Sequence, residues 1–319
     1  MLSDTFGRIH NYLRISVTDA CNLGCVYCMP DGENHTTAKN KLMTADEIDK
    51  IAAVFTGLGI NKIRLTGGEP LFRKDIKEII LSLSKLPVEL SISTNAFFAD
   101  KYIDVFKEAD IRSVNVSLDS LKADEFNFLT KREHFDKILS NIHLLLESEL
   151  NVKVNIVVMK GINDHSIPDF IEWTKDHQLE VRFIEFMPFD KNNWNIGKVF
   201  SYKEILNLIE TKYSFHKIQD SFNDTSRKYR ADGHVGTFGI ISTITDPFCS
   251  GCNRLRLTSD GKLKNCLFSF EETDLLTPFR NNEDIIQLIH TSLNSKKEER
   301  GGQFETGNFI NRSMVSIGG

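Results

Sequence analysis

The stretch YLRISVTDACNLGCVYC (residues 12–28) joins a strand-like apolar run to a short loop that contains three cysteines. These cysteines follow the spacing C-x₃-C-x₂-C, and an aromatic residue stands directly before the last of them. Three more cysteines occur far downstream, so the chain carries two sets of three thiols and no others. The first triad is Cys21, Cys25 and Cys28, and the second is Cys249, Cys252 and Cys266.

Strand-like and helix-like segments alternate through the first two thirds of the chain. In residues 44–59, apolar side chains recur at helical spacing, and Thr44 and Glu47 form a capping-box pattern. Six βα units in a row predict a parallel sheet with helices outside, as an incomplete (βα)6 TIM-type barrel or an open sheet. Ligands bind such sheets at the carboxyl ends of the strands, where the motifs TGGEP, STN, SLD and EFMP fall. The predicted strands are residues 12–17, 62–68, 89–95, 113–119, 152–159 and 180–188.

The pattern changes at about residue 215. We predict that residues 1–214 form the partial barrel and that residues 215–319 form a smaller mixed β/α region packed onto it. Short strand-like runs occur here, and Asp260-Gly261 is a strong signal for a hairpin turn. A helix is expected over residues 282–296.

Composition and charge argue against several classes of protein. The 319 residues carry a net charge of −5, which does not favour nucleic acid or an anionic membrane surface as a partner. The first residues lack the apolar run of a signal peptide, and no segment reaches the length of a membrane span, so a cytoplasmic location is expected. In a reducing compartment, clustered cysteines bind metal or take part in chemistry more often than they form disulfides.

Two kinds of metal site fit a cysteine triad. A structural zinc ion needs a fourth protein ligand, for which His35 is available near the first triad. In an iron–sulfur cluster, three thiolates would bind three irons and leave a fourth iron open to a ligand. Because the chain has no seventh cysteine, the two triads favour two such clusters, and zinc stays open as an alternative at the first triad.

The loop CNLGCVYC resembles the motif of the radical S-adenosylmethionine (SAM) superfamily. Together with RLTGGEPLFR, VNVSLD, EFMP, PFCSGCNRLRLTSDGKLKNCLF and the terminal IGG, it closely resembles the GTP 3′,8-cyclase family, over about residues 8–319. That family performs the first step of molybdenum cofactor biosynthesis. The resemblance implies two [4Fe–4S] clusters, one on each triad, with SAM on the open iron of the first and guanine on the open iron of the second.

The resemblance also implies contact residues. Arginine offers a planar fork that suits phosphate oxygens, and cations within apolar strands are costly unless a ligand or a buried salt bridge pairs them. The terminal Gly318 and Gly319 are implied to reach into the active site and support catalysis. The implied SAM contacts are Tyr27, Gly68 beside Gly67, Ser117 and Met187, and the implied GTP contacts are Arg14, Arg64, Ser93, Lys153, Arg254, Leu255 and Arg256.

The implied reaction uses a 5′-deoxyadenosyl radical to convert GTP to 3′,8-cyclo-7,8-dihydro-GTP. An external electron donor and a downstream enzyme, the cyclic pyranopterin monophosphate synthase, are implied partners, and a homodimer is compatible with the sequence. Two other interpretations stay open. One is a radical SAM enzyme that modifies a peptide and carries an auxiliary cluster, and the other is a non-catalytic zinc-binding interaction protein.

Two segments depart from the family's pattern. In STNA (residues 93–96), Ala96 stands where the family more often has glycine, which predicts an ordinary backbone angle there. The segment KKEERGGQF (residues 296–304) matches only loosely. We expect neither segment to touch the cysteines or the arginines.

Overall fold

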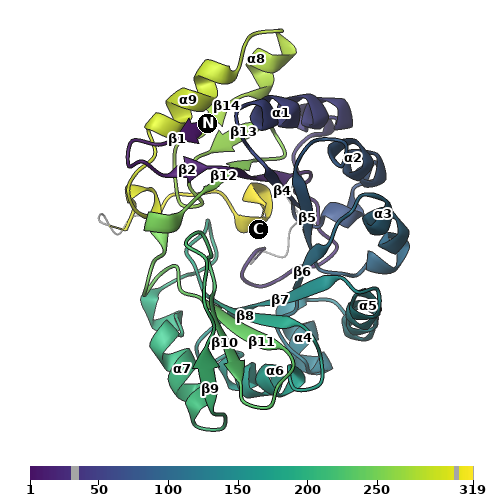
Figure 1. Ribbon diagram of the computed structural model, residues 1–319, viewed down its shortest axis with the longest axis vertical. Helices are drawn as coiled ribbons and strands as arrows, with labels where there is room; N and C mark the ends of the chain where they lie inside the picture. Colours follow the sequence, from purple (N-terminus) through teal and green to yellow (C-terminus); the bar gives the residue numbers. More distant parts are fainter. Residues whose placement is uncertain (30–35, 305–308, 319) are drawn as a thin grey trace.

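The computed structural model describes residues 1–29, 36–304 and 309–318. It is a curved β-sheet with most of its helices along the outer, convex side (Figure 1). The strands are β1 (Leu2–Ser3), β2 (Ile9–His10), β3 (Tyr12–Ser16), β4 (Lys62–Thr66), β5 (Glu89–Thr94), β6 (Ser113–Ser117), β7 (Asn151–Val158), β8 (Glu180–Glu185), β9 (Phe215–Lys217), β10 (Arg227–Ala231), β11 (Thr237–Ile241), β12 (Arg254–Leu257), β13 (Lys262–Lys264) and β14 (Thr273–Asp274). The α-helices are α1 (Ala45–Gly57), α2 (Ile76–Leu83), α3 (Ile103–Glu108), α4 (Ala123–Thr130), α5 (Phe135–Glu147), α6 (Ile167–Trp173), α7 (Tyr202–Glu210), α8 (Leu276–Arg280), α9 (Ile286–Asn294) and α10 (Met314–Ile317).

One twelve-stranded sheet forms the scaffold, in the order β14-β13-β12-β3-β4-β5-β6-β7-β8-β11-β10-β9. All neighbours from β12 through to β11 pair in parallel, and the strands beyond them are antiparallel. The sheet ends at β14 and β9, so within the described residues it is an open, partial barrel. The predicted fold class is therefore confirmed, with the six predicted strands as β3 to β8.

The sheet is nevertheless larger than the six predicted units. Strand β12 pairs with β3 and strand β11 pairs with β8, so the C-terminal part of the chain adds a parallel strand at each end. The predicted hairpin is confirmed as β12 and β13, with Gly261 at a φ of +69° in the turn. The predicted helix of residues 282–296 is shorter at both ends, because α9 covers only Ile286–Asn294.

Alternation along the strands separates the core from the interior of the curved sheet. In β3, Leu13 and Ile15 are fully buried in the hydrophobic core, whereas Arg14 between them lines a cavity. Strands β4 and β12 follow the same pattern, and their register places Arg64 and Arg256 on either side of Arg14. The helices cover the apolar side, and α1 begins with both hydrogen bonds of the predicted capping box.

Ala96 does not have the ordinary backbone angle predicted for it. Its φ is +62°, in the left-handed region, and its side chain is fully buried. The turn after β5 therefore keeps the conformation that favours glycine, although this chain has alanine there.

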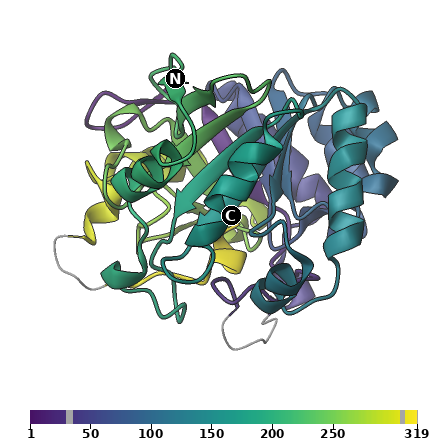
Figure 2. The ribbon, with the colours of Figure 1, turned by 90° about the horizontal axis from the view of Figure 1, so that it is seen from below.

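The C-terminal segment lies inside the curve of the sheet in both views (Figures 1 and 2). Val315 and Ile317 of α10 are buried, and the Gly318 carbonyl accepts a hydrogen bond of 2.8 Å from Arg256 Nη1. Gly319 lies outside the described residues. None of the helices in the described ranges combines the length and the apolarity needed to cross a membrane.

Candidate active site

Two adjoining cavities lie inside the curve of the sheet, and each contains one cysteine triad. The first, of about 180 Å³, lies at the carboxyl ends of the strands and is lined by Cys21, Cys25 and Cys28. The second, of about 330 Å³, is lined by Cys249, Cys252 and Cys266 and extends along the interior to the amino ends of β3 and β4. Four residues line both cavities and mark their border: Asn155, Ile184, Met187 and Met314.

The first cysteine loop is anchored to the end of α4. The backbone N–H of Gly24 donates to the carbonyl of Thr130 over 2.8 Å, and that of Val26 donates to the carbonyl of Leu129 over 2.9 Å. Cys21 Sγ accepts from the Leu23 backbone N–H at 3.4 Å. The protein backbone therefore fixes the loop independently of any ligand.

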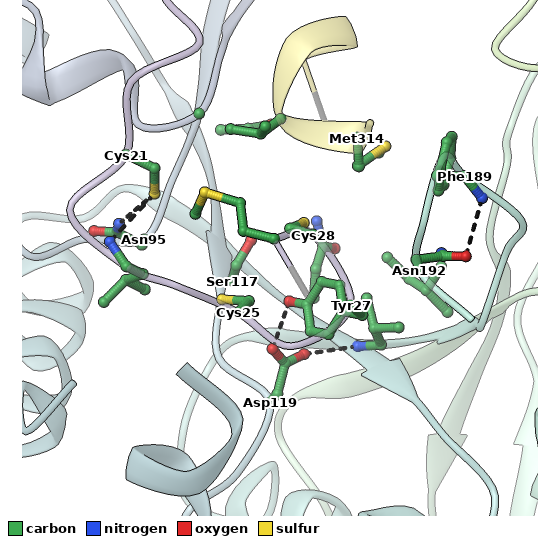
Figure 3. A pocket seen from close by; sticks show the side chains of 18 of the residues that line it. Cys21, Cys25, Tyr27, Cys28, Asn95, Ser117, Asp119, Phe189, Asn192 and Met314 are labelled. Carbon is green, nitrogen blue, oxygen red and sulfur yellow. Dashed lines mark hydrogen bonds between the residues drawn. The ribbon is translucent and has the colours of Figure 1, made fainter. Parts of the chain in front are cut away.

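Tyr27 belongs to this loop and pairs with the buried Asp119 (Figure 3). The Tyr27 hydroxyl donates to Asp119 Oδ2 over 2.6 Å, and the Val157 backbone N–H donates to Asp119 Oδ1 over 2.9 Å. Burial raises the pKa of Asp119 to about 6, against the lowering effect of these hydrogen bonds. Asp119 ends the motif SLD but was not among the predicted site residues. Its place as the last residue of the predicted strand 113–119 was the available signal.

Gly67 and Gly68 allow close packing against the chain just before the cysteine loop. A Cβ atom on Gly67 would lie 2.5 Å from the carbonyl oxygen of Thr18, and one on Gly68 would lie 2.5 Å from that of Ala20. Larger residues cannot fit there without moving the backbone that leads into Cys21. Both glycines also line the first cavity, as do the predicted contacts Ser117, Met187 and Tyr27.

Ser93 and Leu255 lie apart from the other predicted GTP contacts. Ser93 lines the first cavity, where its buried Oγ has no hydrogen-bond partner among the described residues. The Leu255 side chain packs in the hydrophobic core on the opposite face of β12. The remaining five predicted contacts, Arg14, Arg64, Lys153, Arg254 and Arg256, all line the second cavity.

The second cavity is strongly cationic. Burial lowers the pKa of Lys153 to about 8 and, together with the charge of Arg254, that of Arg256 to about 10. Positive groups that depress one another's pKa in a confined space favour an anionic ligand with several charges. Among the described residues, eight cationic side chains line this cavity against the single carboxylate of Asp224: Arg14, Lys62, Arg64, Lys153, Arg182, Arg254, Arg256 and Arg300.

The two segments that depart from the family's pattern do touch cysteines, so the expectation of no contact is wrong. Asn95 Nδ2, in STNA, donates to Cys21 Sγ at 3.9 Å. In KKEERGGQF, Lys296 Nζ donates to Cys252 Sγ at 3.7 Å, and the backbone of Arg300 donates to the Cys249 thiol. The chain folds back after α9 and brings this segment against the second triad, which spacing along the sequence could not reveal.

The donor sets of both triads fit iron–sulfur clusters. Burial raises the pKa of Cys21 to about 12, and burial together with neighbouring thiols raises the pKa of Cys25 and Cys28. Three crowded thiols of this kind ionise when bound metal supplies the positive charge. At the second triad burial opposes ionisation, but the charges of Arg254 and Lys296 lower the pKa of Cys252 to about 6.

The zinc alternative requires protein side chains grouped around one ion. Within the described part of the chain, no three His, Cys, Asp or Glu side chains are grouped so as to hold a single metal ion. A cluster differs in that its thiolates bind separate irons. His35, the suggested fourth zinc ligand, lies outside the described residues.

Comparisons with known proteins agree with this geometry. A model of the radical SAM superfamily matches residues 15–174, and a model named Molybdenum Cofactor Synthesis C matches residues 179–301. Among solved structures, Streptococcus suis SuiB bound to S-adenosylmethionine aligns with a TM-score of 0.65 over 98% of this chain and 72% of that chain, at 13% identity. That likeness concerns the fold alone. Fold and cysteine loop together define a radical SAM protein.

Proteins of similar sequence identify the family to which this chain belongs within the radical SAM class. The mitochondrial GTP 3′,8-cyclase of Arabidopsis thaliana is 44% identical over 100% of this chain and 84% of its own length. The GTP 3′,8-cyclase of Peptoclostridium acidaminophilum is 40% identical over 100% of this chain and 98% of its own length. The chain belongs to the GTP 3′,8-cyclase family. It spans about half of longer relatives, such as the human Molybdenum cofactor biosynthesis protein 1, which is 39% identical over 51% of its length.

Proposed function

We propose that this protein cyclises GTP to 3′,8-cyclo-7,8-dihydro-GTP by radical SAM chemistry, the first step of molybdenum cofactor biosynthesis. The observation that carries the proposal is the pair of adjoining cavities, each with its own cysteine triad, one of them strongly cationic. A triphosphate suits the cationic cavity, and a reactive group formed in one cavity has only a short path to a substrate in the other.

In this proposal, Cys21, Cys25 and Cys28 hold a [4Fe–4S] cluster, which when bound supplies the electron that cleaves SAM to methionine and a 5′-deoxyadenosyl radical. The residues around it orient SAM. Tyr27, which donates a hydrogen bond to Asp119, would pack against the adenosyl group, because it lines the same cavity as Gly68, Ser117 and the first triad. The buried Oγ of Ser93 offers a further hydrogen bond there.

The substrate side is built by β3, β4, β7 and β12. Arg14, Arg64, Lys153 and Arg256 would hold the triphosphate, because all four side chains line one cavity. Three of them come from the adjacent strands β12, β3 and β4, and Lys153 comes from β7. The ribose then falls at the border, beside Asn155. The Oδ1 atom of Asn155 is buried and has no hydrogen-bond partner among the described residues, so it is available to a sugar hydroxyl.

We also propose roles for the second triad and the C-terminal tail, and partners for the protein. Cys249, Cys252 and Cys266 would hold a second [4Fe–4S] cluster that binds guanine, and Gly318 and Gly319 would support catalysis from the tail. An external electron donor and the cyclic pyranopterin monophosphate synthase are the proposed partners, with a homodimer as a candidate assembly. The cytoplasmic location and the division into residues 1–214 and 215–319 also stay predictions.

The decisive test is incubation of the anaerobically prepared protein with GTP, SAM and a reductant. We expect 5′-deoxyadenosine and the cyclised nucleotide to form together, and Cys21→Ala to abolish both. A protein that forms 5′-deoxyadenosine but leaves GTP unchanged under all reducing conditions contradicts the proposal and would favour the peptide-modifying alternative.

A further inference from the structure

Lys296 is a buried cation in direct contact with a cysteine of the second triad. It lies two residues beyond the end of α9 and is only 4% exposed. Its Nζ donates to Cys252 Sγ at 3.7 Å, to the carbonyl of Asn265 at 2.5 Å and to the carbonyl of Arg254 at 3.4 Å. These partners are two neutral carbonyl oxygens and one thiol sulfur.

A buried ammonium group is costly unless an opposite charge lies close to it. Of the three partners, only the Cys252 sulfur can carry a negative charge, and it does so as a thiolate that binds metal. Arg254 Nη2 approaches the same sulfur at 3.6 Å. One ligand of the second triad therefore receives two charged N–H donors.

Backbone contacts hold this arrangement in place. The Arg8 guanidinium donates to the carbonyls of Glu298, Lys297 and Cys249 at 2.6, 3.0 and 3.0 Å, and its Nε donates to Asp4. One fixed side chain thus ties the segment after Lys296 to the loop of the second triad. The distance from Lys296 to Cys252 is a consequence of the fold and not of a mobile surface side chain.

We propose that Lys296 is a positioning residue for the second cluster. Lys296 holds Cys252 in place as a ligand and raises the reduction potential of the cluster. This inference rests on the proposed function, because it requires the second [4Fe–4S] cluster. Hydrogen bonds to the cluster's sulfurs and nearby positive charge stabilise the reduced form, which carries one more negative charge.

The test is a redox titration of the anaerobic holoenzyme, followed by electron paramagnetic resonance. The signal that GTP perturbs reports the second cluster, and the signal that SAM perturbs reports the first. The variants are Lys296→Met and Lys296→Gln, which remove the charge, and Lys296→Arg, which keeps it. Lys297→Met, an exposed neighbour with the same change of charge, is the matched control.

We expect both neutral variants to lower the equilibrium constant for reduction of the second cluster at least tenfold. That is a shift of ~59 mV to more negative potential for one electron. The first cluster should keep its potential, Lys296→Arg should stay within about threefold of wild type by the same relation, and Lys297→Met should not shift. Lys296→Gln retains a donor for the Asn265 carbonyl, so it carries the test if Lys296→Met does not fold.

An unchanged potential in the neutral variants overturns the inference, and so does an equal shift in Lys297→Met. Loss of folded protein in both neutral variants would assign Lys296 to stability of the fold and would also overturn it. Iron analysis separates these results from failure of the proposed function. About four irons per wild-type chain would show that the second cluster is absent and would contradict the proposed function. About eight irons with an unshifted potential would contradict only the role of Lys296.

Discussion

Replacing Gly318 by alanine should separate docking of the tail from stability of the fold. The residue has a φ of +87°, and an added Cβ would lie 2.6 Å from Thr66 Oγ1 and 2.7 Å from Ser16 Cβ. In the docked tail, a left-handed alanine costs about 1–2 kcal/mol. The shift that its Cβ forces on the docked backbone also breaks the hydrogen bond from Arg256 to the carbonyl of residue 318, which costs the docked state about 1.5–3 kcal/mol. Together these terms favour the undocked tail by roughly 2.5–5 kcal/mol, or at least about 50-fold.

We expect Gly318→Ala to form cyclised nucleotide at least about tenfold more slowly, given this loss of docking, while 5′-deoxyadenosine is still produced. The assay is chromatographic quantification of both products, with the thermal unfolding midpoint measured in parallel. Gly233→Ala is the matched control, because Gly233 has a similar φ of +81° and its added Cβ would meet nothing within 4 Å. Cyclisation by Gly318→Ala at the wild-type rate would refute the reasoning, and so would an equal loss in Gly233→Ala.

Four further predictions concern the cavities and the core. Arg256→Ala should weaken GTP binding by about 1.5–3 kcal/mol, and an unchanged affinity by calorimetry would contradict its assignment. Asn155→Ala should leave the unfolding midpoint unchanged or slightly higher, because it removes a buried acceptor that lacks a partner, yet raise the ratio of 5′-deoxyadenosine to cyclised product. Burial, with the charge of Lys296, lowers the pKa of His10 from 6.5 to about 4. Between these pH values the unfolded chain binds the proton and the folded protein does not. The contribution of neutral His10 to the free energy of unfolding is therefore complete above pH 6.5 and is lost as the pH falls toward 4. Urea unfolding at pH 6.5 and 5.0 should therefore show a loss of stability roughly 1.5 kcal/mol smaller in His10→Gln than in wild type. Ala96→Gly should change the free energy of unfolding by less than about 1 kcal/mol, since relief of left-handed strain offsets the lost methyl group and the added chain entropy, whereas a large destabilisation would show that the turn is not strained.

Local sequence was sufficient for the elements whose signals are short-ranged. Apolar periodicity predicted β3 to β8, the capping box predicted the start of α1, and Asp260-Gly261 predicted the hairpin of β12 and β13. Cysteine spacing identified both triads, because the three cysteines of each triad lie within one short stretch of the sequence, residues 21–28 and residues 249–266. These signals depend on residues that are close along the chain, so they can be recognised from the sequence without knowledge of the tertiary fold.

Only the tertiary structure decided which distant segments meet. Parallel pairing of β12 with β3 brings Arg256 beside Arg14, and the return of the chain after α9 brings Lys296 to Cys252. The pairing of β12 with β3 joins residues more than two hundred positions apart, and the contacts that bury Lys296 join residues 31 to 44 positions apart. Local periodicity carries no information about contacts at such separations. The sequence alone therefore determined the cysteine ligands and the βα order, whereas the closeness of the two cavities and the charges around the second triad came from long-range packing.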